Sequence, residues 1–121
     1  MGTCLVVDDS KIVRKICSDI INELGFETEE AEDGQQALEK CQSEKPDFIL
    51  LDWNMPVMNG IEFLEKFRAL DGNENTKVIV CTTENDLEKI QTAISAGANE
   101  YIMKPFDKEI IKGKLEQVGI L

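Results

Sequence analysis

The chain contains 121 residues, and 24 acidic against 13 basic side chains give it a formal net charge of −11 at pH 7. A surface that binds phosphate groups must be basic, so this charge argues against nucleic acid and against an anionic membrane surface as partners. The length suits one domain with its own core, and no apolar run approaches the length of a membrane span. We therefore expect residues 1–121 to form a single domain.

Strand-like and helix-like segments alternate along the whole chain. In chain order, strands are predicted at residues 3–7, 27–31, 48–51, 78–81 and 101–103, and helices at residues 10–24, 34–43, 60–69, 86–96 and 108–118. Strict alternation implies right-handed crossovers and an α/β fold, in which helices cover both faces of a doubly wound five-stranded parallel sheet. Segment 27–31 is the most polar of the strands, which predicts a position at the sheet edge.

The apolar residues of the helices recur every three or four positions, and this spacing predicts the face of each helix that packs inward. In the first helix the predicted inward stripe is Ile12, Ile16, Ile20 and Leu24, widened by Val13, Cys17 and Ile21. Lys11, Arg14 and Lys15 fall on the opposite face, which we expect to be solvated. The predicted inward residues of the later helices are Ala37, Leu38, Cys41, Phe63, Leu64, Phe67, Leu87, Ile90, Ile94, Ile111, Leu115 and Val118.

The four cysteines show no spacing typical of a metal or redox motif, and the chain has no histidine. Zinc-finger and Cys-x-x-Cys functions are therefore excluded. Cys4 and Cys81 lie inside apolar strands and are expected to be buried thiols, whereas Cys17 and Cys41 lie on helices and could be partly exposed. The first strand begins at Thr3, which leaves no space for a signal peptide, so we expect a cytoplasmic protein.

Four predicted strands end in side chains suited to phosphate chemistry. Asp8 and Asp9 follow the first strand, Asp52 the third, Thr82 the fourth and Lys104 the fifth. Parallel strands share one carboxyl edge, where open α/β sheets bind ligands, so these side chains are expected to meet there. Three carboxylates at close range repel one another, and a divalent cation relieves that repulsion. The pattern therefore predicts a Mg²⁺ site beside a nucleophilic aspartate.

Each of these residues also has a purely structural interpretation. Asp8 and Asp9 could cap the following helix, and Thr82 could bond to nearby backbone or cap the fourth helix. Lys104 at a strand end could simply be solvated. The strongest signal is Asp52, because the chain turns this carboxylate outward directly after a buried apolar run.

Two further features of the sequence bear on this site. In the loop after Asp52, Pro56 and Gly60 fix the backbone turn and leave carbonyl groups free to face a cation. Tyr101 either packs at a sheet edge with its hydroxyl in water or acts as a two-position switch, and the sequence does not decide between these alternatives.

Taken together, these stretches resemble a known family. The segments LVVDDS at 5–10, ILLDWNMPVMNG at 49–60 and YIMKPF at 101–106, with Thr82 between the last two, are similar to the receiver domain of response regulators. The likeness extends from about Thr3 to Val118 and is greatest for the single-domain regulators of chemotaxis. It implies the flavodoxin-like strand order 2-1-3-4-5.

The resemblance also implies a role for each site residue. Asp52 would be the phosphoacceptor in a two-component signalling pathway. Asp9, Asp52 and the backbone carbonyl of Asn54 would bind Mg²⁺ directly, and Asp8 would bind it through water. Lys104 would contact a phosphoryl oxygen. After phosphorylation Thr82 would bind another phosphoryl oxygen and Tyr101 would turn inward.

The resemblance implies a signalling switch, not an enzyme, that promotes only its own phosphorylation and slow dephosphorylation. Its expected partners are a histidine kinase and a protein effector bound to the fourth helix, fifth strand and fifth helix; the flagellar motor switch is one candidate. We expect a monomer. The leading alternative is a phosphorelay shuttle or phosphate sink without an effector. A Mg²⁺-dependent phosphatase with an aspartate nucleophile and a flavin-binding module are weaker alternatives.

Overall fold

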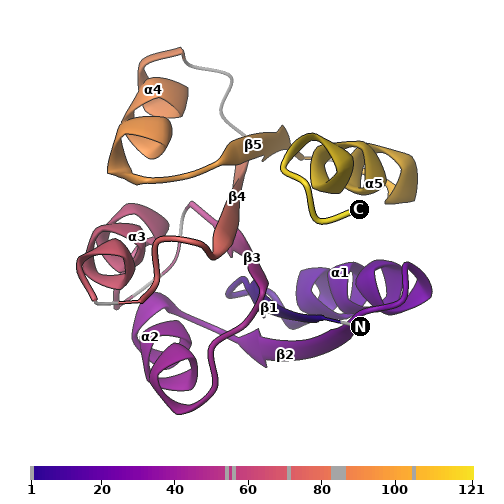
Figure 1. Cartoon of the computed structure of the whole chain (residues 1–121), viewed down its shortest axis with the longest axis horizontal. Helices are drawn as coiled ribbons and strands as arrows, with labels where there is room; N and C mark the ends of the chain where they lie inside the picture. Colours follow the sequence, from indigo (N-terminus) through magenta and orange to yellow (C-terminus); the bar gives the residue numbers. More distant parts are fainter. Residues whose placement is uncertain (1, 54, 56, 71, 83–86, 105) are drawn as a thin grey trace.

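The computed structural model describes residues 2–53, 55, 57–70, 72–82, 87–104 and 106–121. Across these residues one sheet contains five strands, which are β1 (Thr3–Val7), β2 (Glu27–Ala31), β3 (Phe48–Asp52), β4 (Lys77–Thr82) and β5 (Glu100–Met103). Their order is β2-β1-β3-β4-β5, and all neighbours are parallel (Figure 1). The expected fold class and strand order are confirmed.

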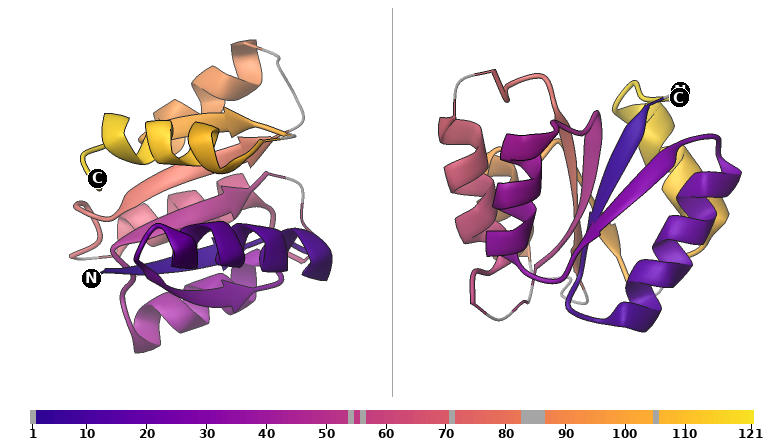
Figure 2. Two further views of the ribbon diagram at one scale, coloured as in Figure 1. Left: turned by 90° about the vertical axis from the view of Figure 1, so that its right-hand side faces the viewer. Right: turned by 90° about the horizontal axis from the view of Figure 1, so that it is seen from below.

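Five helices in the described part of the chain alternate with these strands. They are α1 (Lys11–Glu23), α2 (Gly34–Ser43), α3 (Gly60–Ala69), α4 (Leu87–Ala96) and α5 (Lys108–Gln117). Figures 1 and 2 show α1 and α5 on one face of the sheet and α2, α3 and α4 on the other. Residue 86, where the sequence predicted the fourth helix to begin, lies outside the described residues.

Short polar side chains determine where the helices begin. Ser10, Asp33, Asn59 and Asp107 each precede a helix and accept a hydrogen bond from the backbone N–H three residues further on. At α3 the carboxylate of Glu62 also accepts from the Asn59 backbone N–H, which completes a capping box. Each such bond satisfies a backbone donor that has no partner within its helix.

The sheet separates two buried clusters of side chains. One lies under α2 and α3 and contains Leu51, Phe63 and Phe67, and the other lies under α1 and α5 and contains Phe48 and other residues. Strands β1, β3 and β4 are buried almost throughout, as central parallel strands must be. Strand β2 exposes three of its five residues, so its predicted edge position is confirmed.

The predicted inward face of α1 is partly wrong. Ile12 and Ile16 are 74% and 50% exposed, whereas Cys17 and Ile21 are buried against the sheet, and Val13 packs beside them. The inward face therefore centres on Cys17 and Ile21, with Ile20 and Leu24 also packed against the core as predicted, and it is rotated away from Ile12 and Ile16 alone. The sequence carried two overlapping apolar stripes, and the way in which α1 docks on β1 and β2 selects one of them.

Helix α4 also differs from its prediction. Leu87 and Ile94, both expected to face inward, are 67% and 45% exposed, and Ala93 is the buried residue of the described helix. The predicted inward residues of α2 and α3 do lie in or against the core. Helix α4 therefore packs on α3 and β5 mainly through the small side chains of Ala93 and Ala96, and it leaves two large apolar side chains uncovered.

All four cysteines are buried free thiols. This confirms the expectation for Cys4 and Cys81, and it corrects the partial exposure suggested for Cys17 and Cys41. Burial raises the pKa of the Cys17 thiol to about 11 and that of Cys41 to about 12, so neither is an active nucleophile at neutral pH. None of the described helices is long and apolar enough to span a membrane.

The rotated face of α1 leads to a direct test of stability. We expect Ile21→Ala to lower the free energy of unfolding by about 2–5 kcal/mol, because it opens a cavity in the core. Ile12→Ala should change it by less than about 0.5 kcal/mol, because this side chain is mainly in water. Urea unfolding of both variants measures the difference, and comparable losses would restore the original assignment of the inward face.

Candidate functional site

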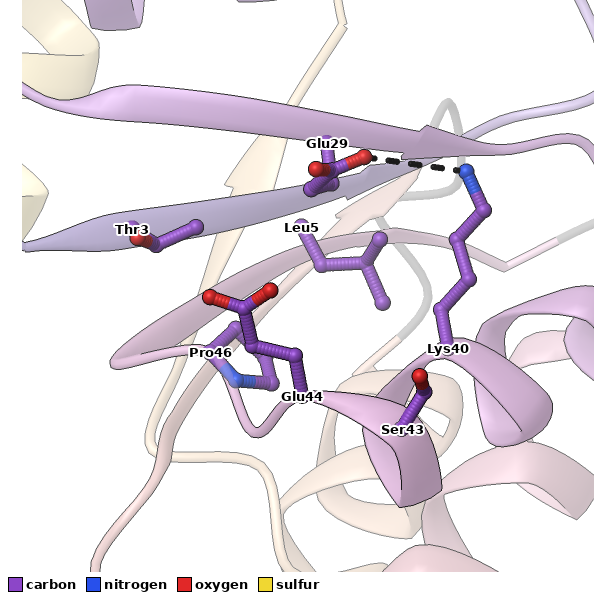
Figure 3. Close-up of a pocket in the computed structure, with 7 residues that line it drawn as sticks. All are labelled: Thr3, Leu5, Glu29, Lys40, Ser43, Glu44 and Pro46. Atoms are coloured by element: carbon purple, nitrogen blue, oxygen red, sulfur yellow. Dashed lines mark ion pairs between the residues drawn. The ribbon is translucent and has the colours of Figure 1, made fainter.

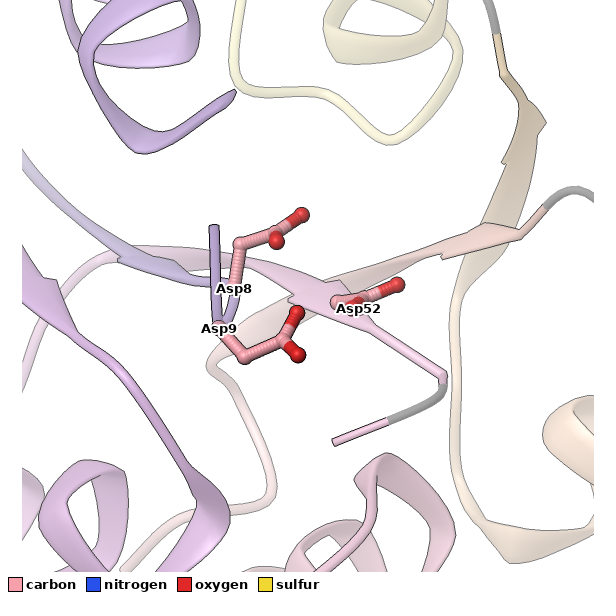
Figure 4. A group of neighbouring side chains, drawn as sticks. All are labelled: Asp8, Asp9 and Asp52. Carbon is pink, nitrogen blue, oxygen red and sulfur yellow. The ribbon is translucent and has the colours of Figure 1, made fainter. Parts of the chain in front are cut away.

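The carboxyl ends of β1 and β3 bring three aspartates together. Asp8 and Asp9 follow the last residue of β1, and Asp52 is the last residue of β3. One ligand atom from each of the three carboxylates lies within 4.8 Å of the others (Figure 4). Asp8 and Asp52 are buried, with 4% and 7% exposure, whereas Asp9 is open to solvent. The clustering predicted for these aspartates is therefore present.

Lys104 lies between two of these carboxylates. Its Nζ donates a hydrogen bond to Asp8 Oδ2 at 3.0 Å and another to Asp52 Oδ1 at 3.1 Å. Burial lowers the pKa of the Lys104 ammonium, but its bonds to Asp8 and Asp52 outweigh that effect and raise the pKa above its usual value. Lys104 is therefore a charged partner of the aspartates and not a solvated side chain at a strand end.

Asp52 carries an unfavourable negative charge. Burial raises the pKa of its carboxyl group, the nearby charge of Asp8 raises it further, and Lys104 offsets only part of this. Asp9 adds to the same effect from the solvent side. A second positive charge placed among the three carboxylates would therefore stabilise the ionised form of Asp52.

The donor set fits a hard divalent cation. Carboxylate oxygens from three residues converge, and no described residue hydrogen bonds to the Asp9 carboxylate, so its oxygens remain available. One ammonium group does not balance three carboxylates. Mg²⁺ prefers such oxygen ligands and keeps several of its waters, which suits a site open on the side of Asp9.

The backbone after Asp52 is held close to the site. Trp53 N–H donates to Cys81 O at 3.0 Å, and Gly60 N–H donates to Trp53 O at 3.1 Å. A Cβ atom at Gly60 would come within 2.4 Å of the Asp52 carbonyl oxygen, so only glycine permits this approach. Val57 in the same loop has φ 68°, an unusual value for a β-branched residue.

The other predicted site residues that the structure describes lie on β4, which neighbours β3, and on β5, the edge strand beyond it. Thr82 is buried at the end of β4, and its backbone carbonyl accepts from the Lys104 N–H at 2.8 Å. Tyr101 on β5 is half-buried, and Lys114 Nζ lies 4.9 Å from the centre of its ring. Asn54, whose carbonyl was an expected Mg²⁺ ligand, lies outside the described residues, as does Pro56.

A small cavity occurs at the opposite end of β1. It has a volume of about 150 Å³ and lies between β1, β2 and the end of α2, with Leu5 among its lining residues (Figure 3). Lys40 and Glu29 form an ion pair of 3.9 Å beside it. None of the predicted site residues lines this cavity.

The comparisons with known proteins agree with this geometry. Residues 4–116 match the family model described as the response regulator receiver domain. The chain therefore belongs to the response regulator receiver family and is a signalling switch rather than an enzyme. Membership implies a histidine kinase as a partner of the chain.

Relatives with the same architecture are similar over almost the whole chain. The chemotaxis protein CheY1 of Helicobacter pylori is 42% identical over 116 residues, which are 94% of each chain. The chemotaxis protein CheY of Pseudomonas aeruginosa is 39% identical over 115 residues, 94% of this chain and 93% of its own. A structure of the chemotaxis protein CheY4 of Vibrio cholerae superposes with a TM-score of 0.93 at 38% identity and covers 98% of both chains.

Sequence reasoning missed one residue of the site. Arg14 was assigned to the solvated face of the first helix, but its side chain is only 12% exposed. Its Nη1 donates to the backbone carbonyl of Asp8 at 2.7 Å. The position of Arg14 four residues after the helix cap was the available signal, because that spacing places it over the first turn of α1.

The raised pKa of Asp52 predicts a stability effect with a definite sign. When the folded pKa of a carboxyl group lies above its unfolded value, its ionised form destabilises the fold. Without divalent cations at pH 7, Asp52→Asn should therefore be more stable than wild type and should unfold at a higher Tm. The gain should shrink as the pH falls through the folded pKa of Asp52, because the wild-type carboxyl group then becomes neutral.

Thermal unfolding at pH 7 and near pH 4 measures this effect. Asp19→Asn is the matched control, because Asp19 is exposed on α1 and, among the described residues, forms an ion pair with Lys15 alone. A wild-type protein as stable as Asp52→Asn at pH 7 would contradict the electrostatic strain assigned to Asp52.

Proposed function

We propose that the protein carries a chemotaxis-type signal by accepting a phosphoryl group on Asp52 from a histidine kinase. The observation that supports this most directly is the joint placement of Asp52 with Asp8, Asp9 and Lys104 at the end of β3. The similarity to chemotaxis proteins over 94% of the chain supports the same pathway. The four buried free thiols suit the reducing cytoplasm, where we place the protein.

The residues of the site have different roles in phosphoryl transfer. An Asp52 carboxylate oxygen attacks the phosphorus of the phosphorylated histidine of the kinase. The bond from phosphorus to the histidine nitrogen breaks, the histidine leaves, and an aspartyl phosphate forms on Asp52. The Lys104 ammonium lies 3.1 Å from Asp52 Oδ1, which supports its proposed role in binding an oxygen of the incoming group. Such transfer depends mainly on positioning and charge neutralisation, which these groups provide.

Mg²⁺ is the proposed cofactor. Asp9 and Asp52 are its proposed direct ligands, together with the Asn54 carbonyl, while Asp8 binds it through water. The ion supplies positive charge for the phosphoryl oxygens and for the crowded carboxylates. The solvent exposure of Asp9 and the absence of a described hydrogen-bond partner for its carboxylate support this assignment.

Thr82 and Tyr101 are the proposed switch residues. Thr82 ends β4, and its backbone carbonyl accepts from the Lys104 N–H, which supports a role for its hydroxyl in binding a phosphoryl oxygen once Asp52 is modified. Tyr101 turns inward in response. The α4–β5–α5 face is the proposed effector site, and its exposed Leu87, Ile94 and Ile110 are apolar side chains that a partner can cover. The flagellar motor switch is the effector that the similarity to chemotaxis proteins favours.

Phosphorylation by a small donor tests the assignment of Asp52. With acetyl phosphate and Mg²⁺, wild-type protein should gain one phosphoryl group in its intact mass, and the fluorescence of the neighbouring Trp53 should change. Asp52→Asn should gain none, and omission of Mg²⁺ should abolish the reaction, whereas Asp19→Asn should behave as wild type. A phosphoryl group retained in Asp52→Asn would exclude Asp52 as the acceptor.

The switch assignment predicts that Thr82→Ala still becomes phosphorylated but loses its response to phosphorylation. A hydrogen bond to a charged phosphoryl oxygen stabilises the active state by about 1.5–3 kcal/mol, so the phosphorylation-dependent gain in effector affinity should fall at least tenfold. Titration of a motor switch protein with each phosphorylated variant measures this.

Thr28→Ala, on the far edge strand β2, is the control for the loss of a hydroxyl group. An unchanged effector response in Thr82→Ala would contradict the coupling. A phosphate sink differs in another way, since wild-type protein would then drain phosphate from a kinase and form no complex with an effector.

A further inference from the structure

Every polar atom of Asp8 has a hydrogen-bond partner, and these partners come from β2, from the start of α1 and from the end of β5. Its N–H donates to Ala31 O at 3.1 Å, its Oδ1 accepts from Ser10 N–H at 2.9 Å, and its Oδ2 accepts from Lys104 at 3.0 Å. Its carbonyl oxygen accepts from Arg14 Nη1 at 2.7 Å. Only this last contact acts on the peptide group that joins Asp8 to Asp9.

That peptide group determines the direction in which Asp9 leaves the strand. A peptide unit is planar, so fixing the Asp8 carbonyl oxygen also fixes the Asp9 nitrogen and the Asp9 Cα. Asp9 is exposed, and no described residue holds its carboxylate. Among the described contacts, the bond from Arg14 to Asp8 O is the one that holds the peptide group before Asp9, while the Ser10 N–H bond to Asp8 Oδ1 holds the peptide group after it.

Arg14 is itself held in place. Its Nε donates to Glu30 Oε1 at 3.0 Å, and Ser18, which is buried, donates to Glu30 Oε2 at 3.3 Å. The guanidinium group thus bridges the edge strand β2 and the end of β1 with two donors of fixed relative direction. Lysine would supply the same charge from a single nitrogen and could not reproduce both bonds.

We propose that Arg14 is a positioning residue of the metal site, which holds the Asp8–Asp9 peptide so that Asp9 turns its carboxylate to the cation. The inference rests on the proposed function, because it takes the cation to be Mg²⁺. Arg14 contacts neither the cation nor the phosphoryl group and acts only through the Asp8 carbonyl.

If Arg14 acted only through its charge, a substitution at Arg14 would change Mg²⁺ affinity in the opposite direction from the one that positioning predicts. Removing a positive charge near a cation site should strengthen cation binding. Positioning predicts weaker binding. Loss of a group that hydrogen bonds to a metal ligand commonly lowers metal affinity by about 10–100-fold. The sign of the change in Kd therefore separates the two roles.

The test is a Mg²⁺ titration of the full chain, followed by the fluorescence of Trp53. We expect Arg14→Met and Arg14→Lys to raise the Kd at least about tenfold. Lys15→Met, which removes one charge from the exposed neighbouring position, should leave the Kd within about twofold because exposed charges are screened. Glu30→Gln, which loosens Arg14 without removing it, should give a smaller rise. Circular dichroism establishes that each variant is folded.

A second measurement needs no cation. In the metal-free protein the amide ¹H–¹⁵N resonance of Asp9 should shift in Arg14→Lys and stay in place in Lys15→Met. An unmoved Asp9 resonance, or an Arg14→Met variant that binds Mg²⁺ as tightly as wild type or more tightly, overturns the inference. Failure of the proposed function is distinguishable, since wild-type protein would then neither bind Mg²⁺ nor accept a phosphoryl group although the Asp9 resonance still moves.

Discussion

The pair of bonds from Lys104 to Asp8 and Asp52 is the interaction on which the site depends. Lys104 lies 96 positions after Asp8 and 52 positions after Asp52 in the sequence. The two bonds can therefore form only when β1, β3 and β5 occupy one sheet. The fold forces like charges together at the ends of β1 and β3, and the ammonium group relieves this only in part. That remaining excess of negative charge makes the site receptive to a cation and, through it, to a phosphoryl group.

The sequence allowed the sheet and the acidic site to be predicted because both depend on short-range patterns. Buried parallel strands read as continuous apolar runs, and the residue after each run must lie at the carboxyl edge of the sheet. Asp52 and Lys104 could thus be placed together without knowledge of the strand order. The polar composition of segment 27–31 likewise predicted the edge strand.

The remaining features depend on how helices dock, which local patterns indicate only weakly. Ile12 and Ile21 belong to apolar stripes of similar quality, and only packing on the sheet buries one and exposes the other. Arg14 looked solvated because a charged residue near a helix start usually is, and its bond to Asp8 O needs the precise approach of α1 to β1. The exposure of Leu87 and Ile94 reflects the peripheral position of α4 in the same way.

The thin packing of α4 has an energetic consequence. A helix that buries little more than Ala93 gains little free energy from its place on the sheet, so detaching or tilting it costs less than moving α3, which buries Phe63, Leu64 and Phe67. The protein thus places α4, a weakly packed helix with uncovered apolar side chains, beside β5, which carries Tyr101, and close to β4, which ends in Thr82.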